Sequence, residues 1–381
     1  MSLLSNKYES QSAQGERGVL DLTFLLLVLT LLVFGLVMMF SASYANAYYY
    51  EDNSFHYISR QLVFAVIGIA ALVFFANIDY HVWRRFAWVA LIVSMLLLLI
   101  VFTQRPVNKA HRWIWIGSFS IQPTEIAKFA MVLFFAHLID LYKDKMNTFR
   151  YGILPFGVIL VALAGLIIPE PHLSATVLIF LIAAIMLFVG GLGLKWYGIG
   201  VVGVGALATV AMMIPKIQER AMYRIEIWQN PFIDPQDAGF QTIQSLYAIG
   251  SGGLLGAGIG NSRQKYLFLP EPQNDFVFAI VCEELGFIGA VLVLLLFALL
   301  IWRGFSIALK ARDTFGTMLA TGLTAQVGLQ AILNVAVVTN TVPNTGISLP
   351  FFSYGGTSLL MLLAQMGVIL SVSRYTALEK T

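Results

Sequence analysis

The chain consists of long apolar runs separated by short polar stretches. An apolar run of about 20 residues can cross roughly 30 Å of hydrocarbon as a helix. Ten such runs lie near residues 20–42, 61–77, 83–103, 123–141, 152–168, 173–190, 194–214, 275–302, 313–338 and 353–373. Open sheets would leave backbone groups without partners in lipid. The pattern therefore predicts a single all-α polytopic membrane domain, residues 1–381, with about ten transmembrane helices.

Composition points to the same class of protein. Hydrophobic residues make up 59% of the chain and charged residues 11%, whereas a globular domain carries about 25% charged residues. The net charge of +3 is too small to indicate nucleic-acid binding. The single cysteine, Cys282, lies inside an apolar run, which excludes a disulfide framework and a cysteine-based metal site. Leu20–Phe40 is too long for a signal-peptide core and is predicted to be an uncleaved first span.

Lys and Arg residues in the short loops predict the orientation. They concentrate on the side that carries both chain ends, so residues 1–19 and 374–381 are expected to be cytoplasmic tails. The short loops of the other side contain only Arg60, Arg105, Lys109 and Arg112.

A large outer loop, residues 215–274, is predicted between the seventh and eighth spans. Loops of this length without clear regular structure are usually functional. Arg224 lies there among aromatic residues, in a partly amphipathic stretch expected to lie on the bilayer. Gly250–Gly260 contains no strict G-x-G-x-x-G pattern, which disfavours a dinucleotide site. Flexible backbone that approaches a ligand closely is the simpler interpretation.

The segment around Asp275 joins this loop to the eighth span. Asn274 and Asp275 are good N-cap residues, and a carboxylate at the membrane edge also suits chemistry on a lipid-borne substrate. The segment alone does not separate the two interpretations. Glu283 lies eight residues further on, about 12 Å deeper along a helix, and Glu284 falls on the opposite face. Both are as well suited to binding neighbouring helices as to binding substrate.

A second cluster precedes the fourth span. Alternating residues around Gly117 predict a short hairpin, and Pro123 suits the first turn of a helix. Glu125 and Lys128 share a face of that helix. Charged groups inside a span suggest function by default, and Arg112 offers a planar fork of donors for phosphate oxygens. The alternative is a structural ion pair at the interface, with tryptophans as anchors.

Two further stretches contain polar groups on the outer side. In the turn Pro169–Thr176, Glu170 and His172 are too few to make a metal site, so a structural turn is the favoured interpretation. Asn344–Leu360 opens the tenth span with free backbone N–H groups that could hold an anion, or it packs to close the bundle.

Taken together, these motifs resemble the SEDS family (shape, elongation, division and sporulation), whose members include RodA, FtsW and SpoVE. The resemblance covers nearly the whole chain. It rests on Arg112-Trp113, Gln122-Pro123-Thr124-Glu125, Lys128, Asn230-Pro231, Gly239-Phe240-Gln241, Gln244-Ser245, Gly250-Ser251-Gly252-Gly253, Leu269-Pro270-Glu271, Asp275-Phe276, Glu283-Glu284-Leu285-Gly286 and Leu349-Pro350-Phe351-Phe352-Ser353-Tyr354-Gly355-Gly356.

The chain departs from the family pattern at His172 and Ser174, where many members have Asp and Gly. A carboxylate role in that turn is therefore in doubt. Thr124 replaces the commoner Ser. Leu36–Ser43 and Tyr48-Tyr49-Tyr50 look more like the FtsW/SpoVE branch than RodA.

The resemblance implies a peptidoglycan glycosyltransferase of the bacterial cytoplasmic membrane that polymerises lipid II with inversion and releases undecaprenyl diphosphate. Asp275 would be the catalytic base. Glu283 and Glu284 would be supporting residues, and Mg²⁺ or Mn²⁺ is a possible cofactor. Implied partners are a class B penicillin-binding protein, which is a transpeptidase, and other division or elongation proteins. Substrate contacts would come from Arg112, Trp113, Gln122, Glu125, Lys128, Arg224, Gln241, Gln244, Ser353, Gly355 and Gly356.

Two other functions compete with this one. A ten-span bundle with a few charged residues would also suit a flippase that carries lipid II across the membrane. Against it, the candidate residues all lie on the outer side, whereas transporter sites usually sit near the midplane. A non-catalytic scaffold for division proteins would leave Asp275 as a helix cap.

Overall fold

The computed structural model describes residues 18–104, 111–117, 119–170 and 173–376. A helix lies at each of the ten predicted spans, which confirms the all-α membrane fold. In chain order these helices are α2 (Leu22–Glu51), α3 (His56–Asn77), α4 (His81–Val101), α5 (Pro123–Tyr142), α6 (Leu154–Ile167), α7 (Leu173–Val189), α8 (Leu194–Met212), α11 (Val277–Leu309), α12 (Thr314–Val338) and α13 (Gly356–Arg374).

Seven of these helices, taken with the short turn before α6, are long and apolar enough to cross a membrane by themselves. The other three are α5, α7 and α8. Helix α5 carries three charged residues, Glu125, Lys128 and Asp140, and α7 is only 17 residues long. Short elements complete the described chain: β1 (Ile114–Ile116), β2 (Phe119–Ile121), the 3₁₀ helices η1 (Lys143–Lys145) and η3 (Pro231–Ile233), and the π-helical turn η2 (Phe149–Ile153).

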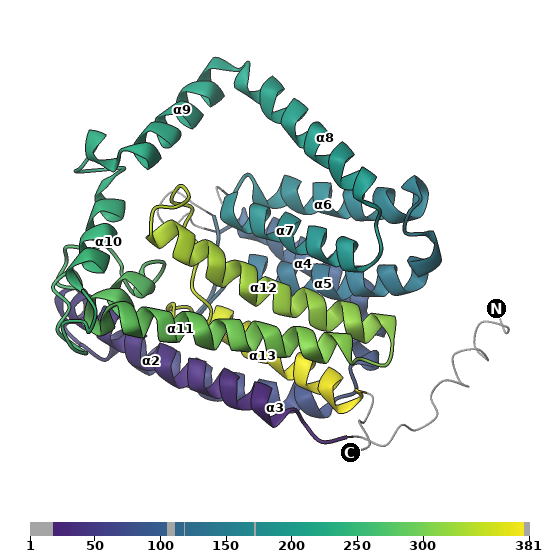
Figure 1. Ribbon diagram of the computed structural model, residues 1–381, viewed down its shortest axis with the longest axis horizontal. Coiled ribbons are helices and arrows are strands. Elements are labelled where there is room, and N and C mark those ends of the chain that lie inside the picture. Colours follow the sequence, from purple (N-terminus) through teal and green to yellow (C-terminus); the bar gives the residue numbers. More distant parts are fainter. Residues whose placement is uncertain (1–17, 105–110, 118, 171–172, 377–381) are drawn as a thin grey trace.

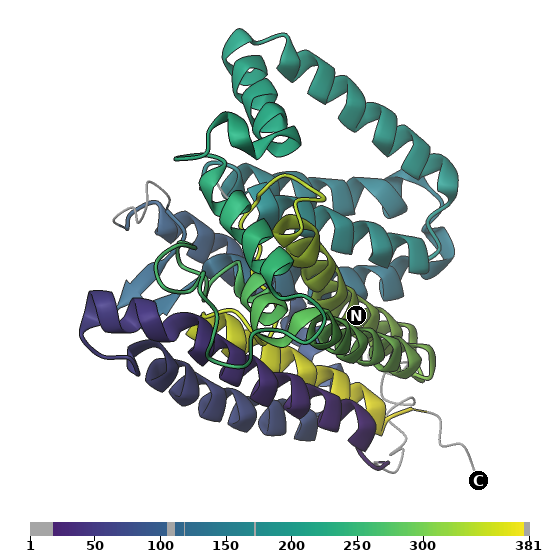
Figure 2. The ribbon, with the colours of Figure 1, turned by 60° about the vertical axis from the view of Figure 1, so that its left-hand side comes forward.

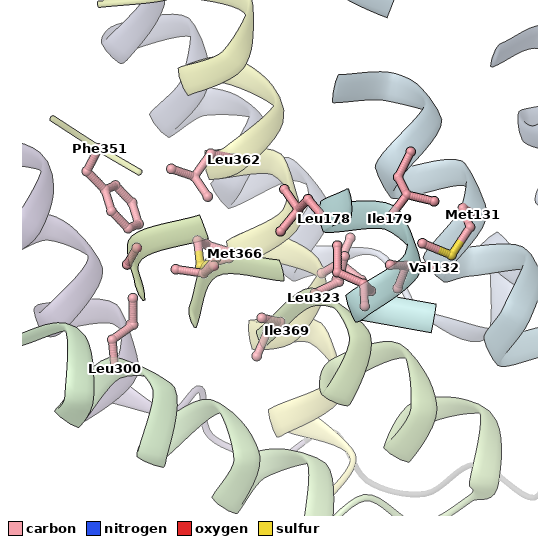
Figure 3. Packing of buried hydrophobic residues seen from close by; sticks show 14 of the residues in the cluster. Met131, Val132, Leu178, Ile179, Leu300, Leu323, Phe351, Leu362, Met366 and Ile369 are labelled. Atoms are coloured by element: carbon pink, nitrogen blue, oxygen red, sulfur yellow. The ribbon is translucent and has the colours of Figure 1, made fainter. Parts of the chain in front are cut away.

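The central helices are α5, α12 and α13 (Figure 1). In the most apolar 18-residue stretch of each helix, 72% of the residues are buried in α12 and 78% in α13, against 22% in α3. Figure 3 shows how this core is filled: Met131 and Val132 of α5 and Leu178 and Ile179 of α7 pack towards Leu323 of α12. Dense packing of this kind holds the bundle together where the lipid supplies no hydrophobic driving force.

We call the two ends of the bundle the large-loop end, which carries residues 215–274, and the termini end, where α2 begins and α13 ends. Ion pairs tie helices together at the termini end. Arg303 on α11 pairs with Asp21 at 2.8 Å, and Arg84 on α4 pairs with Asp140 on α5 at 2.8 Å. The Tyr80 hydroxyl donates to Asp313, which caps α12.

The large loop contains more regular structure than the sequence suggested. It includes α9 (Pro215–Gln229) and α10 (Phe240–Ser251) as well as η3. Helices α8 and α9 project away from the bundle and meet at an apex in both views (Figures 1 and 2). The end of α9 is fixed to the segment after α12 by two hydrogen bonds between Trp228 and Asn340, each 3.1 Å. Whether α9 lies on the bilayer stays a prediction.

Whether the glycine-rich run approaches a ligand stays a prediction; in the structure its backbone completes a broken helix. Helix α11 is interrupted at Gly286, where φ is 66° and ψ is −166°. The interruption leaves backbone groups of α11 without helical partners, and the glycine-rich loop supplies them. The four bonds are Ala257 N–H to Glu283 O, Gly258 N–H to Glu284 O, Phe287 N–H to Gly253 O and Ile288 N–H to Leu254 O, at 2.9–3.2 Å.

Two glycines make this close approach possible. A Cβ on Gly252 would lie 2.0 Å from the Cys282 carbonyl oxygen. A Cβ on Gly256 would lie 2.2 Å from the Glu284 carbonyl oxygen, and its φ of 79° is unfavourable for other residues. The glycine run is therefore explained by backbone packing inside the protein, which is where irregular backbone is tolerated at membrane depth.

Candidate active site

A cavity of about 600 Å³ lies at the large-loop end of the bundle. Its walls come from α3, the β1–β2 hairpin, α5, α7, α12 and the segments that precede α11 and α13. Its size is in the range of small-molecule and cofactor sites. The cavity brings together nine of the residues singled out from the sequence: Arg112, Trp113, Gln122, Glu125, Lys128, Asp275, Ser353, Gly355 and Gly356.

Asp275 is not the N-cap of α11. The helix begins at Val277, its N-cap is Phe276, and no side chain caps it. The backbone at Asp275 is instead held by buried Asn334, whose amide donates to the Asp275 carbonyl at 2.7 Å and to the Ile347 carbonyl at 2.6 Å. No hydrogen bond to the Asp275 carboxylate is found among the described residues. The fold therefore fixes the backbone of this residue and leaves its carboxylate facing the cavity.

Burial raises the pKa of the Asp275 carboxyl to about 6; Arg112 opposes this shift and Glu271 adds to it. The ordinary value is near 3.9, where a carboxylate is a weak base for an alcohol. Desolvation therefore outweighs the opposing charge of Arg112. A pKa nearer to neutrality makes a better general base.

Arg112 lies between two carboxylates. Its side chain interacts electrostatically with Asp275 and Glu170, and its Nε atom is 3.5 Å from the Glu170 carbonyl oxygen. Burial lowers the pKa of the guanidinium, while the two carboxylates raise it. The group nevertheless stays charged, because its ordinary pKa is far above neutrality.

Glu170, in the turn predicted to be structural, is fully buried. Its two carboxylate oxygens have no hydrogen-bond partner among the described residues, and burial raises the pKa of this carboxyl to about 8 against the opposing charge of Arg112. His172 lies outside the described residues. Within the described part of the chain, no group of three histidine, cysteine or carboxylate side chains could hold a metal ion.

Glu125 and Lys128 form an ion pair on α5, with Lys128 Nζ 2.8 Å from Glu125 Oε1. Both side chains are buried and both line the cavity. Lys128 Nζ also lies 3.5 Å from Gln330 Oε1, and Gln330 donates to the Ser348 hydroxyl at 3.0 Å. The pair is thus both an interior ion pair and part of the cavity wall, so the two sequence-based interpretations are compatible.

The predicted hairpin is present, with Ile114 paired to Ile121 and Gly117 in the turn at φ 63°. It presents Trp113 and Trp115 to the cavity. Gln122 follows β2 and accepts a hydrogen bond from Ser358 on α13 at 3.4 Å. The hairpin therefore forms one wall and positions the start of α5.

The segment before α13 has partners for some of the backbone groups expected to bind an anion. The Gly355 N–H donates to Gln61 Oε1 at 3.2 Å, and the Ser353 hydroxyl accepts from the Leu349 N–H at 2.7 Å. Gly355 is the N-cap of α13 and provides no side-chain cap. The positive end of the α13 dipole still faces the cavity through Gly355 and Gly356.

Three residues assigned to substrate from the sequence lie outside the cavity lining. Arg224 is exposed on α9, and Gln244 is half-buried on α10. Gln241 donates to the Pro270 carbonyl at 3.3 Å and accepts from Asn344 at 3.2 Å, which connects the segments before α11 and α13. The structure does not bring these side chains together with Asp275.

Glu283 and Glu284 also lie outside the cavity lining, in a buried network. Lys265 Nζ is 2.9 Å from Glu284 Oε1, and the Ser41 hydroxyl donates to the Glu284 carboxylate at 2.7 Å. The Ser262 hydroxyl donates to Glu283 at 2.5 Å. The two carboxylates thus hold the large loop to α2 and α11, consistent with the interpretation that they bind neighbouring elements.

The sequence analysis missed the wall formed by the start of α3. His56, Tyr57 and Arg60 at the start of α3 line the cavity there, together with Glu51 at the end of α2. They belong to no motif singled out above, and they reach the site because α3 packs along α13. The available signal was Arg60, one of the few cations in the short loops of the predicted outer side.

With this geometry described, the chain can be compared with known proteins. A family model described as "Cell cycle protein", which covers FtsW, RodA and SpoVE, matches residues 21–378. The chain belongs to this family. It is 42% identical over 360 residues to "Stage V sporulation protein E" of Bacillus subtilis, covering 93% of this chain and 97% of that protein. It is 39% identical over 357 residues to "Probable peptidoglycan glycosyltransferase FtsW" of Trichlorobacter lovleyi, covering 93% of each.

Solved structures of family members share the fold. The Thermus thermophilus rod shape determining protein RodA matches with a TM-score of 0.69 and 25% identity, over 95% of this chain and 99% of that one. A chain of the structure called "Structural coordination of polymerization and crosslinking by a peptidoglycan synthase complex" matches with a TM-score of 0.76 and 28% identity, over 93% and 98%. The identities agree with the predicted resemblance to the FtsW/SpoVE branch.

Proposed function

We propose that the chain is a peptidoglycan glycosyltransferase that polymerises lipid II, with the large-loop end facing outward from the bacterial cytoplasmic membrane. The observation that carries this proposal is the Asp275 carboxylate, which faces a cavity beside Arg112 and has no hydrogen bond among the described residues. The cavity continues to buried Lys128 and to apolar side chains such as Leu362. Polar chemistry and a lipid anchor can therefore be accommodated together. The names of the FtsW relatives support the assignment.

The reaction would join two lipid-linked disaccharides. Asp275 takes the proton of the acceptor's 4-hydroxyl as that oxygen bonds to the donor's anomeric carbon. The bond from this carbon to the donor diphosphate breaks, and undecaprenyl diphosphate leaves with the electron pair. Attack opposite the leaving group gives inversion and a β-1,4 linkage.

Negative charge develops on the diphosphate as it leaves, and fixed cations placed there stabilise the transition state. We assign this role to Arg112 and Lys128. Lys128 already pairs with Glu125. Its contribution to stabilising the leaving diphosphate therefore depends on how far this ion pair opens. A bound Mg²⁺ or Mn²⁺ would neutralise charge on the diphosphate, with diphosphate oxygens, waters and a carboxylate of the lining such as Glu271 as ligands. No step above depends on it.

The transporter alternative is less well supported. Among the described residues, the charged side chains of the cavity lie at or near the helix ends on the large-loop side, and ion pairs connect helices at the termini end. The scaffold alternative would require Asp275 to be a helix cap, and the structure gives α11 no side-chain cap.

Assembly with a class B penicillin-binding protein is part of the proposal. The support is the similarity to a chain in a structure described as a peptidoglycan synthase complex. The test uses purified protein, alone and with a cognate transpeptidase whose cross-linking is blocked, and labelled lipid II. Glycan ladders on a gel are expected from the native chain and not from Asp275→Ala.

Asp237→Asn is the matched control, because Asp237 is an exposed acid of the same loop outside the cavity lining. It is expected to give ladders like the native chain. If no partner yields a ladder, yet vesicles containing the protein scramble labelled lipid II, the chain is a transporter and the proposal is wrong.

A further inference from the structure

Polymerisation of lipid II requires the enzyme to hold two diphosphates at once. The donor's diphosphate leaves, whereas the acceptor keeps its own diphosphate throughout the reaction. This requirement follows from the reaction proposed above, on which the inference rests. A cavity suited to the reaction should therefore contain two separate sites of positive charge.

Among the described residues, three Lys or Arg side chains line the cavity: Arg60, Arg112 and Lys128. The function proposed above assigns Arg112 and Lys128 to the leaving diphosphate and leaves Arg60 without a role. We propose that Arg60 binds the diphosphate of the acceptor.

The surroundings of Arg60 differ from those of the other two cations. Arg60 is exposed on α3, about one helical turn from the first residue, and no ion pair with a described carboxylate reaches it. Its side chain interacts electrostatically with Tyr354, which also lines the cavity. Lys128, by contrast, is buried against Glu125. The charge of Arg60 is therefore the more readily available to an incoming anion.

The position of Arg60 also fits a lipid-borne ligand. Helix α3 is the least buried of the seven apolar helices, so this wall borders the lipid. Phe64, one turn further along α3, lines the cavity as well and provides an apolar surface for the start of a prenyl chain. The N-terminus of α13, through Gly355, adds its dipole to the same wall. Glu51 and Glu271 also line the cavity and partly oppose the charge.

The two proposed sites are formed by different elements of the fold. Arg112 precedes the hairpin and Lys128 lies on α5, whereas Arg60 lies on α3, which packs along α13. The donor site would thus combine Arg112 on the hairpin side with Lys128 on α5, and the acceptor site would lie between α3 and α13. Asp275 would then meet an acceptor hydroxyl whose lipid anchor is held at a distance from the leaving group.

The test counts bound diphosphates without any chemistry. Farnesyl diphosphate is added to the full chain in neutral phosphatidylcholine nanodiscs, and bound equivalents are counted by native mass spectrometry. The native chain is expected to bind two. In Arg60→Ala the apparent Kd of one equivalent should rise by roughly tenfold or more, as expected for loss of a charge-assisted contact. Arg112→Ala should weaken the other equivalent.

Arg263→Ala is the control, because Arg263 is exposed on the large loop outside the cavity lining; it should bind two equivalents. One equivalent on the native chain, or two of unchanged affinity on Arg60→Ala, would overturn the inference. So would displacement of the Arg60-dependent equivalent by phosphatidylglycerol, because the site would then take any anionic headgroup. Glycan ladders from a native chain that binds one diphosphate would leave the proposed function standing and this inference wrong. Two bound equivalents without glycan ladders would support this inference and count against the proposed function.

Discussion

Asp275 and the Glu283–Glu284 pair lie within ten residues of each other, and their surroundings are opposite. Glu284 accepts hydrogen bonds from Lys265 and Ser41 and is fully buried. Asp275 is partly exposed, lines the cavity, and its carboxylate has no hydrogen bond from the described residues. The Glu283–Glu284 pair stabilises the fold, whereas the Asp275 carboxylate is available to a ligand in the cavity. The comparison shows that a charge near a membrane acquires its role from its partners and not from its depth.

The variant Asp275→Asn tests this difference most directly. If the carboxylate is a general base, the polymerisation rate should fall by about 10²–10⁴-fold. Stability should not fall with it, since no described hydrogen bond to the carboxylate is lost. Initial rates of lipid II consumption and thermal unfolding in the same detergent measure both. A variant that unfolds early would place Asp275 with the structural carboxylates.

Glu284→Ala should behave in the opposite way. It leaves the Lys265 ammonium buried without its counter-ion, which typically costs about 3–5 kcal/mol. The unfolding midpoint should drop, and the rate per folded molecule should stay near the native value. The double variant Glu284→Met with Lys265→Met should recover part of the stability, because it leaves no buried charge. A catalytic defect in a folded Glu284→Ala protein would contradict this assignment.

A smaller effect is expected from pH. Because Asp275 must be ionised to act as a base and its pKa is about 6, the rate should fall about tenfold per unit as pH decreases below 6. The folded pKa lies above the unfolded value near 3.9, so the folded state holds this proton more tightly. The stability contributed by this group is present below pH 4 and is lost as pH rises through 6. In Asp275→Asn that loss should be absent.

These profiles are measured as rate against pH and as unfolding midpoint against pH, for the native chain and for Asp275→Asn. An activity that stays flat down to pH 4.5 would mean that the base titrates elsewhere.

The positions of the helices could be predicted because apolar length alone specifies a span. Helices α9 and α10 were missed because Pro215–Gln229 is too polar to resemble a span and Phe240–Ser251 is short. The roles of the carboxylates could not be separated, because Lys265, the partner of Glu284, lies 19 residues away in the loop. Arg60 was not linked to Asp275, since only the packing of α3 along α13 brings it to the cavity.

The interruption of α11 at Gly286 also has a consequence for how the protein is made. Its unpaired carbonyl and N–H groups would be costly in lipid until the Gly253–Gly258 backbone reaches them. Synthesis runs from the N-terminus, so that backbone is made before the helix it completes. Large-loop residues from Gly253 to Lys265 can therefore serve as an intramolecular assembly factor for α11. Moving this loop to a later place in the chain should hinder membrane insertion even where every mature contact could still form.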